Sequence, residues 1–205
     1  MNLPSKDKKG GRYLSYSQIT TFKNSREDYY NRYILKVPFE GNEYTDFGSN
    51  VGEALENSNF TKFTDRETAI LKQITRLDVF ERRIKIEYDS FYLIGYIDTS
   101  TIDLSRIIDY KTGGLKKEFQ YMENDYNQLH VYALGIRQET GIHVKDASVE
   151  FIRRGGNAYR DQKLFVKDEN PIVIPQDLSE ERLKHVYWDI LRTAKEIEKF
   201  YKENK

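Results

Sequence analysis

The sequence predicts an α/β domain, and three observations lead to that expectation. Residues 79–113 change to the short alternating pattern and turn signals that are typical of β-strands. Residues 183–197 place apolar side chains three or four positions apart, which is the period of an amphipathic helix. A chain of 205 residues with 38% hydrophobic composition is also long enough to build one core without disulfides or a structural metal.

The first 75 residues are expected to be mostly helical. Residues 1–12 show no periodicity and are expected to be a flexible basic lead-in to a single domain, residues 13–205. Ser17 is the expected N-cap of the first helix, and Asn24-Ser25 can divide this helix in two. The expected helices cover residues 17–34, 47–58 and 65–75, with a loop at residues 38–46.

The remainder is expected to alternate strands and helices, without a repeat or a linker that would divide domains. A hairpin turns at Asp89-Ser90, and a later helix closes at Gly141, because glycine readily takes the left-handed conformation that ends many helices. A final helix follows Pro175 and Ser179. The expected strands cover residues 79–88, 91–100, 106–113, 147–156 and 162–168, and the expected helix between them covers residues 126–141.

Composition excludes several kinds of protein. The 33 basic and 33 acidic residues give zero net charge, which argues against a polybasic binder. A nuclease can still be neutral when acids gather at a metal and bases line a groove. The absence of cysteine excludes disulfides, iron–sulfur clusters and thiol nucleophiles. No apolar run approaches the roughly 20 residues of a membrane span, and the N-terminus lacks a signal-peptide pattern, so we expect a cytoplasmic protein without a membrane partner.

The segment "IIDYKTGG", residues 107–114, carries an acid and a base at the end of a buried strand. Asp109 and Lys111 point to the same side of an extended chain, and Tyr110 points to the other. Antiparallel pairing with the preceding strand would bring Asp98 to Asp109. Two carboxylates can hold Mg²⁺ or Mn²⁺, and a lysine can stabilise phosphorane charge or orient and deprotonate the attacking water. A salt bridge between strand ends is the simpler explanation of a lone Asp-x-Lys.

A wider, ordered set of motifs makes the catalytic interpretation stronger. Gly95-x-x-Asp98 is followed by Asp109-Tyr110-Lys111-Thr112-Gly113, and then by "NQLHVYALGI" with Gln128 and Tyr132 on one helical face. Upstream, "YLSYSQITTF" opens a helix with an S-x-S pattern. Together these motifs resemble the PD-(D/E)XK nuclease superfamily, specifically its RecB-like exonuclease branch.

The resemblance implies a restriction-endonuclease-like core, with a mixed central β-sheet flanked by α-helices. It implies a Mg²⁺- or Mn²⁺-dependent DNA nuclease in DNA processing, recombination or repair, and favours an exonuclease over a sequence-specific cutter. Because the chain lacks a G-x-x-x-x-G-K-[ST] motor motif, a separate helicase or recombination protein is a possible partner besides DNA. The implied catalytic residues are Asp98, Asp109, Lys111, Gln128 and Tyr132, and the carbonyl of Tyr110 is an added metal ligand. The resemblance also implies that Gln128 and Tyr132 face the active site and contact DNA.

One departure from the family pattern concerns the metal. The family's first motif has a histidine ligand where "GSNVGEALE" places Gly52. Glu56 lies one helical turn beyond Gly52 and could fill the vacancy directly or through water. A solvated helix residue is an equally good explanation of Glu56.

A basic rim is the last candidate feature of the sequence. Lys116, Lys117, Arg153 and Arg154 could contact phosphates, although a solvated surface explains any one of them equally well. Two other functions stay open. One is a catalytically weak or inactive nuclease fold that binds DNA or a protein partner, which Gly52 motivates. The other is an α/β domain unrelated to nucleic acids, which would make the motif order a coincidence.

Overall fold

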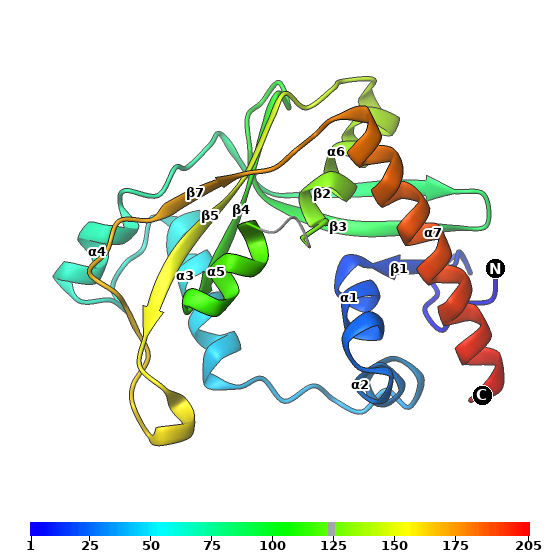
Figure 1. The fold of residues 1–205 in the computed structure, drawn as a ribbon, viewed down its shortest axis with the longest axis horizontal. Helices are drawn as coiled ribbons and strands as arrows, with labels where there is room; N and C mark the ends of the chain where they lie inside the picture. The colour runs from blue at the N-terminus through cyan, green and yellow to red at the C-terminus, as the bar shows by residue number, and fades with distance from the viewer. Residues whose placement is uncertain (123–125) are drawn as a thin grey trace.

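A seven-stranded mixed β-sheet forms the centre of the computed structural model, which describes residues 1–122 and 126–205 (Figure 1). Strand β3 pairs along its length with β2, and its two ends pair with β1 in parallel and β4 in antiparallel orientation. Strand β4 runs parallel to β5, which pairs with β6 and β7. The strands are β1 Tyr13–Ser15, β2 Val79–Tyr88, β3 Phe91–Ser100, β4 Arg106–Gly113, β5 Asp146–Gly155, β6 Phe165–Val166 and β7 Ile172–Pro175.

Helices cover both faces of this sheet, as the sequence predicted (Figure 1). On one face, α1, α6 and α7 pack on a large core that includes Ile107 and Phe151, and on the other, α3 and α4 pack on a smaller core that includes Ile152. The helices are α1 Tyr16–Asn24, α2 Arg26–Tyr29, the π-helical turn η1 Tyr30–Ile34, α3 Glu43–Asn57, α4 Asp65–Leu71, α5 Leu115–Met122, α6 Gln128–Thr140, the 3₁₀ turn η2 Ala158–Arg160 and α7 Glu180–Glu203.

Several boundaries differ from the sequence predictions for identifiable reasons. Ser15, not Ser17, caps α1 by accepting from the backbone N–H of Gln18. Helix α3 begins at Glu43 inside the expected loop, because Asn42 and Thr45 form a capping box. This capping box was not predicted from the sequence. The elements β1, β7 and α5 were not predicted, since three to eight residues are too few to show a clear period.

The chain's first residues pack against the domain. The side chain of Leu3 is fully buried in the larger core, and the backbone N–H of Asn2 donates to Glu198 on α7 at 2.6 Å. Arg12 donates to the carbonyl of Leu3. Flexibility of residues 1–12 stays a prediction, but these contacts tie the segment to α7.

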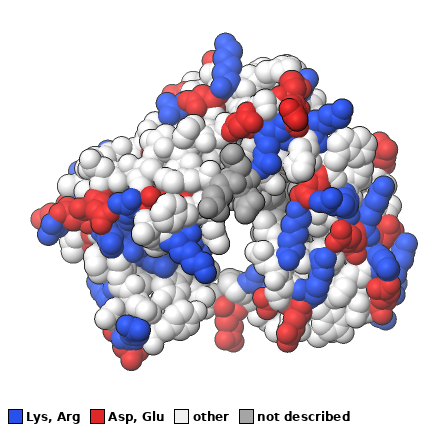
Figure 2. All heavy atoms as spheres, viewed as in Figure 1, with Lys and Arg blue, Asp and Glu red and all other residues white. Residues whose placement is uncertain are grey.

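An opening separates two parts of the molecule, one containing α3 and α5 and the other containing α1, α2 and α7 (Figure 2). Residues 35–42 link the two parts along the lower edge of this opening (Figure 1). The linking segment exposes large apolar side chains, because Leu35, Val37 and Phe39 are each more than half exposed. Among the described residues no helix is long and apolar enough to cross a membrane.

Candidate active site

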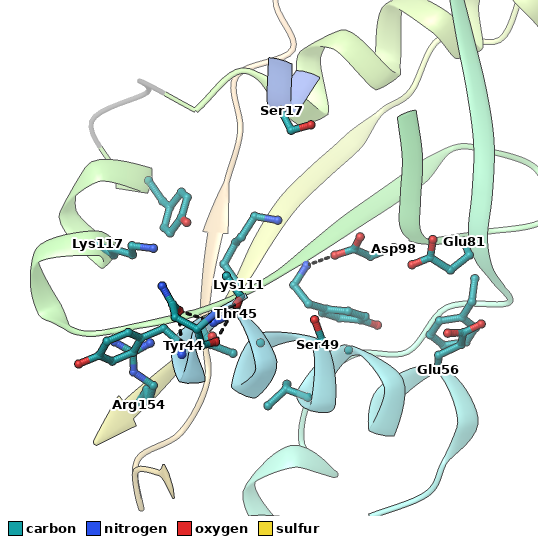
Figure 3. Close-up of a pocket in the computed structure, with 18 of the residues that line it drawn as sticks. Ser17, Tyr44, Thr45, Ser49, Glu56, Glu81, Asp98, Lys111, Lys117 and Arg154 are labelled. Carbon is teal, nitrogen blue, oxygen red and sulfur yellow. Dashed lines mark hydrogen bonds between the residues drawn. The ribbon is translucent and has the colours of Figure 1, made fainter. Parts of the chain in front are cut away.

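A pocket of about 1130 Å³ lies between α1, α3, α5 and the adjoining strands β2, β3 and β4 (Figure 3). It collects residues from elements far apart in the sequence, including Asp98 and Lys111 of the motifs, whereas the fully buried Asp109 lies outside its lining. Its polar and charged lining residues include Ser17, Ser49, Glu56, Glu81, Asp98, Lys111, Lys117 and Arg154.

The strand register brings Asp98, Asp109 and Lys111 together. Strands β3 and β4 pair only at Thr99 with Ile108 and Ser100 with Ile107, so the strands separate just where the two aspartates follow. The backbone N–H of Tyr110 donates to Oδ2 of Asp98 at 2.7 Å, which bridges the gap between the strands. The Nζ atom of Lys111 lies 2.5 Å from Oδ2 of the fully buried Asp109.

Burial and mutual repulsion shape the charges at this point. Burial raises the pKa of Asp98 to about 7, and the carboxylates of Asp109 and Glu81 add to the rise. Burial opposes the charge on Lys111, but the carboxylates of Asp109 and Asp98 outweigh it and raise the lysine's pKa above its usual value. At neutral pH Lys111 is therefore a cation and a hydrogen-bond donor, so without a further charge it is a poor base.

The donor set fits a divalent cation in part. Oδ1 of Asp109 is buried and has no hydrogen-bond partner among the described residues, although a buried carboxylate oxygen normally has one. A cation beside it would supply that partner and relieve the repulsion between Asp98 and Asp109. Within residues 1–122 and 126–205 no group of three or more His, Asp and Glu side chains is arranged to hold a metal. Two carboxylates are therefore the core of the set, which suits Mg²⁺ because it keeps several waters.

The α3 side of the pocket is open at the position of the missing histidine. A Cβ atom built on Gly52 would meet nothing within 4 Å, so a side chain fits there. Glu56 is exposed and lines the same pocket. The sequence analysis missed Glu81, whose carboxylate lies beside that of Asp98 (Figure 3). The hairpin register could have revealed it, because residues 80 and 82 pair with residues 99 and 97 and leave Glu81 opposite Asp98.

Glu81 also has an unusual backbone. Its φ of 49° is in the left-handed region, which a non-glycine residue within a strand rarely adopts. Such conformations cost of order 1–3 kcal/mol and concentrate at functional sites. Burial, together with the nearby Glu56, raises the pKa of Glu81.

The two downstream motif residues pack against the upstream motif. Nε2 of Gln128 lies 2.6 Å from the hydroxyl of Tyr132, whose ring is buried over Gly95. A Cβ atom at Gly95 would fall 2.3 Å from that ring, so only glycine fits. Gln128 and Tyr132 line a smaller cavity of about 350 Å³ next to the main pocket. Tyr126, which the sequence analysis missed, joins them to Asp109, because its hydroxyl lies 2.8 Å from Oδ2 of Asp109.

The four basic residues of the predicted rim have different surroundings. Lys117 and Arg154 line the main pocket, and Arg154 stacks over the ring of Tyr44 at 4.1 Å. The guanidinium of Arg153 is instead bound by Glu118 and Glu169, and Lys116 is exposed outside the pocket lining. DNA contacts from Lys116 and Arg153 stay predictions, and Arg153 would have to leave two carboxylates to make them.

The chain is similar to solved structures in fold and to one family model in sequence. The fold resembles a protein of Eubacterium rectale named "Putative exonuclease", with a TM-score of 0.61 and 13% identity, over 95% of this chain and 83% of that chain. A phage-related exonuclease of Haemophilus somnus 129PT matches at 14% identity and a TM-score of 0.43, over 98% of this chain and 90% of that chain. No curated protein matches. The model of the PD-(D/E)XK nuclease superfamily matches residues 59–201, most of the chain, and the protein therefore belongs to this superfamily.

Proposed function

We propose that the protein is a Mg²⁺- or Mn²⁺-dependent deoxyribonuclease that degrades DNA from its ends. The observation that carries this proposal is that Asp98 and Lys111 line one pocket, and that Asp109, which pairs with Lys111, has a buried oxygen without a partner among the described residues. These residues come from two strands that separate at that position. A structural salt bridge needs neither the second aspartate nor the unpaired oxygen.

Asp98 and Asp109 would hold the metal, with the Tyr110 carbonyl and either Glu56 or Glu81 as further ligands. When bound, the ion would polarise the scissile phosphate and supply a reactive hydroxide. Lys111 would donate to a phosphate oxygen as negative charge develops there. Its raised pKa supports this role over that of a base. Lys117 and Arg154 would hold the DNA backbone at the rim.

Action at ends is supported by the opening beside the pocket (Figure 2). Residues 35–42 link the two parts of the chain along its lower edge, so a strand that passes through the opening would have to be threaded by its end. A closed circle has no end to thread. A separate helicase or recombination protein would deliver such an end, and participation in recombination or repair belongs to the same proposal.

A weak or inactive nuclease fold that binds DNA is the second candidate, and the vacancy at Gly52 favours it. The two candidates differ in one respect, because only the first needs Asp109 to bind a metal ion that takes part in cleavage.

Incubation with linear, circular and single-stranded DNA in Mg²⁺, Mn²⁺ or EDTA tests the proposal. We expect metal-stimulated loss of linear DNA, no cleavage in EDTA, and protection of the closed circle. Binding without cleavage under every condition would contradict the nuclease proposal and support the second candidate. Cleavage of the circle at the rate of linear DNA would contradict action at ends alone.

A further inference from the structure

Tyr126 contacts the side chains of Asp109 and Lys111, although it belongs to none of the motifs. Its hydroxyl lies 2.8 Å from Oδ2 of Asp109, and Nζ of Lys111 lies 5.4 Å from the centre of its ring, within the range of a cation–π contact. We propose that Tyr126 is a positioning residue that holds the Asp109 carboxylate and the Lys111 ammonium in the orientation that the reaction needs. This inference rests on the proposed nuclease function.

The two oxygens of Asp109 have different surroundings. Oδ2 receives two donors, the hydroxyl of Tyr126 and the ammonium of Lys111 at 2.5 Å. Oδ1 is buried without a partner among the described residues. Two donors on one oxygen fix the rotation of the carboxylate and leave the lone pairs of the other oxygen available. Removing the Tyr126 hydroxyl would leave Lys111 alone to hold that rotation, and Lys111 must also reach the phosphate.

The number of protons gives the hydrogen bonds a direction. The Tyr126 hydroxyl lies 2.8 Å from Asp109 and 2.7 Å from Oε1 of Gln128, but it has only one proton to donate. Asp109 is ion-paired with Lys111 at 2.5 Å, and a hydrogen bond to a carboxylate in an ion pair is roughly twice as strong as one to a neutral amide, so the proton goes to Asp109. Gln128 must then present its NH₂ group to Tyr126. The oxygen and nitrogen of a side-chain amide are assigned from the hydrogen bonds around them, and rotating the Gln128 amide about its last side-chain bond exchanges the two atoms.

With that orientation each polar group in this series of hydrogen bonds has a partner. With the amide rotated, Tyr132 would donate to the Gln128 oxygen at 2.6 Å and Gln128 would donate to Tyr126 at 2.7 Å, while Tyr126 donates to Asp109 at 2.8 Å. Gln128 and Tyr132 would thus act on the metal-binding carboxylate through Tyr126, not only on DNA. Gly95 belongs to the same unit because it makes room for the Tyr132 ring.

Packing is the competing explanation of Tyr126, since its ring meets the edges of Tyr16 and Tyr121. Tyr126→Phe separates the two explanations because it keeps the ring and removes only the hydroxyl. We expect kcat on linear DNA to fall about 10- to 100-fold with KM unchanged, and Mn²⁺ affinity measured by calorimetry without DNA to fall about 10-fold. Partners that orient a metal ligand typically contribute about 10- to 100-fold in metal affinity or activity.

Tyr88→Phe is the matched control. The Tyr88 hydroxyl is also buried, has no hydrogen-bond partner among the described residues, and lies at the hairpin end of β2, where its ring stacks on Phe91. We expect this variant to keep the wild-type kcat, KM and Mn²⁺ affinity.

Gln128→Glu independently tests the direction of these hydrogen bonds. A carboxylate cannot donate to Tyr126, so we expect kcat to fall at least as far as in Tyr126→Phe. If the Gln128 oxygen instead received the Tyr126 proton, glutamate would accept it as well, and kcat would stay near the wild-type value. This second variant carries the test if Tyr126→Phe does not fold, as judged by circular dichroism.

The outcomes separate this inference from the proposed function. Wild-type protein that neither binds Mn²⁺ nor cleaves DNA would overturn the proposed function before any variant is compared. Active wild type together with a Tyr126→Phe variant of unchanged kcat or unchanged Mn²⁺ affinity would overturn the positioning role alone. A loss of DNA affinity at constant kcat would also overturn it, because that is the result expected of a DNA contact.

Discussion

The two sides of the candidate active site are built differently. One side, which we call the Asp109 wall, consists of Asp109, Lys111, Tyr126, Gln128 and Tyr132. Its polar groups are joined by hydrogen bonds, and Gly95 has no space for even a methyl group. The other side, which we call the α3 wall, consists of Gly52 and Glu56 on α3 together with Glu81 on β2. It has free space at Gly52, and its two acids and Asp98 repel one another across the pocket.

This difference suggests how the two walls divide the work. Preorganised groups stabilise a transition state without having to move, which suits the Asp109 wall for catalysis. An open wall binds a metal loosely but leaves room for water and phosphate. We therefore expect substitutions in the Asp109 wall to change turnover, together with folding or metal affinity, and substitutions in the α3 wall to leave turnover and change chiefly metal affinity.

The largest effect is expected at the centre of the Asp109 wall. Asp109→Asn or Lys111→Ala should lower the cleavage rate on the order of 10²–10³ or more, because each removes a charge that acts in the transition state. Circular dichroism should show an intact fold, and filter binding should show most of the DNA affinity. Cleavage by both variants near the wild-type rate would remove these residues from the mechanism.

Gly95→Ala should also damage the Asp109 wall, through packing. Its Cβ would fall 2.3 Å from the Tyr132 ring, and overpacking of this kind typically costs about 1–3 kcal/mol. Gly52→Ala is the matched control in the α3 wall, where the same methyl group meets nothing within 4 Å and an interior helix position gains about 0.5–1 kcal/mol. Chemical denaturation should give free-energy changes of opposite sign. Equal changes at both positions would mean that the two walls are equally rigid.

Much of this arrangement was predictable from the sequence. The alternation of Asp109, Tyr110 and Lys111 placed the acid and the base on one face, and the strand ends placed Asp98 near them, as the structure has them. The mixed sheet with flanking helices was confirmed. Tyr126 could not be found this way, because it precedes α6 and has no motif or period to mark it. The hairpin register could have placed Glu81 opposite Asp98, but no sequence pattern indicated its left-handed backbone.

The pH dependence of stability should reveal the crowding of acids that the two walls share. The pKa of Asp98 is raised to about 7 in the folded chain and is near 3.9 in an unfolded one. A raised pKa contributes stability below the unfolded value that is lost as pH rises through the folded value. In EDTA, Asp98→Asn should therefore match the wild-type melting temperature near pH 4 and exceed it by several degrees at pH 8. An offset independent of pH would show that Asp98 ionises normally.

The smallest effect is expected in the α3 wall and concerns metal affinity alone. An ion held by two aspartates and a carbonyl keeps more waters than one with a fourth protein ligand, so we expect half-saturation at high metal concentration and a preference for Mn²⁺. Gly52→His should tighten Mn²⁺ binding, because the site has space and its helix face lines the pocket. The fold should tolerate it, since glycine within a helix is itself unfavourable.

Glu56→Gln and Glu81→Gln then identify which acid serves in place of the histidine. The acid that ligates should weaken Mn²⁺ binding when it is neutralised in the wild-type chain, and should matter less once Gly52→His supplies a ligand. The strained backbone of Glu81 and its place opposite Asp98 favour Glu81 over the exposed Glu56. Calorimetric titration of the single and double variants with Mn²⁺ measures the difference. Unchanged affinity in every variant would mean that the α3 wall does not contact the metal, and that the Asp109 wall with Asp98 holds it alone.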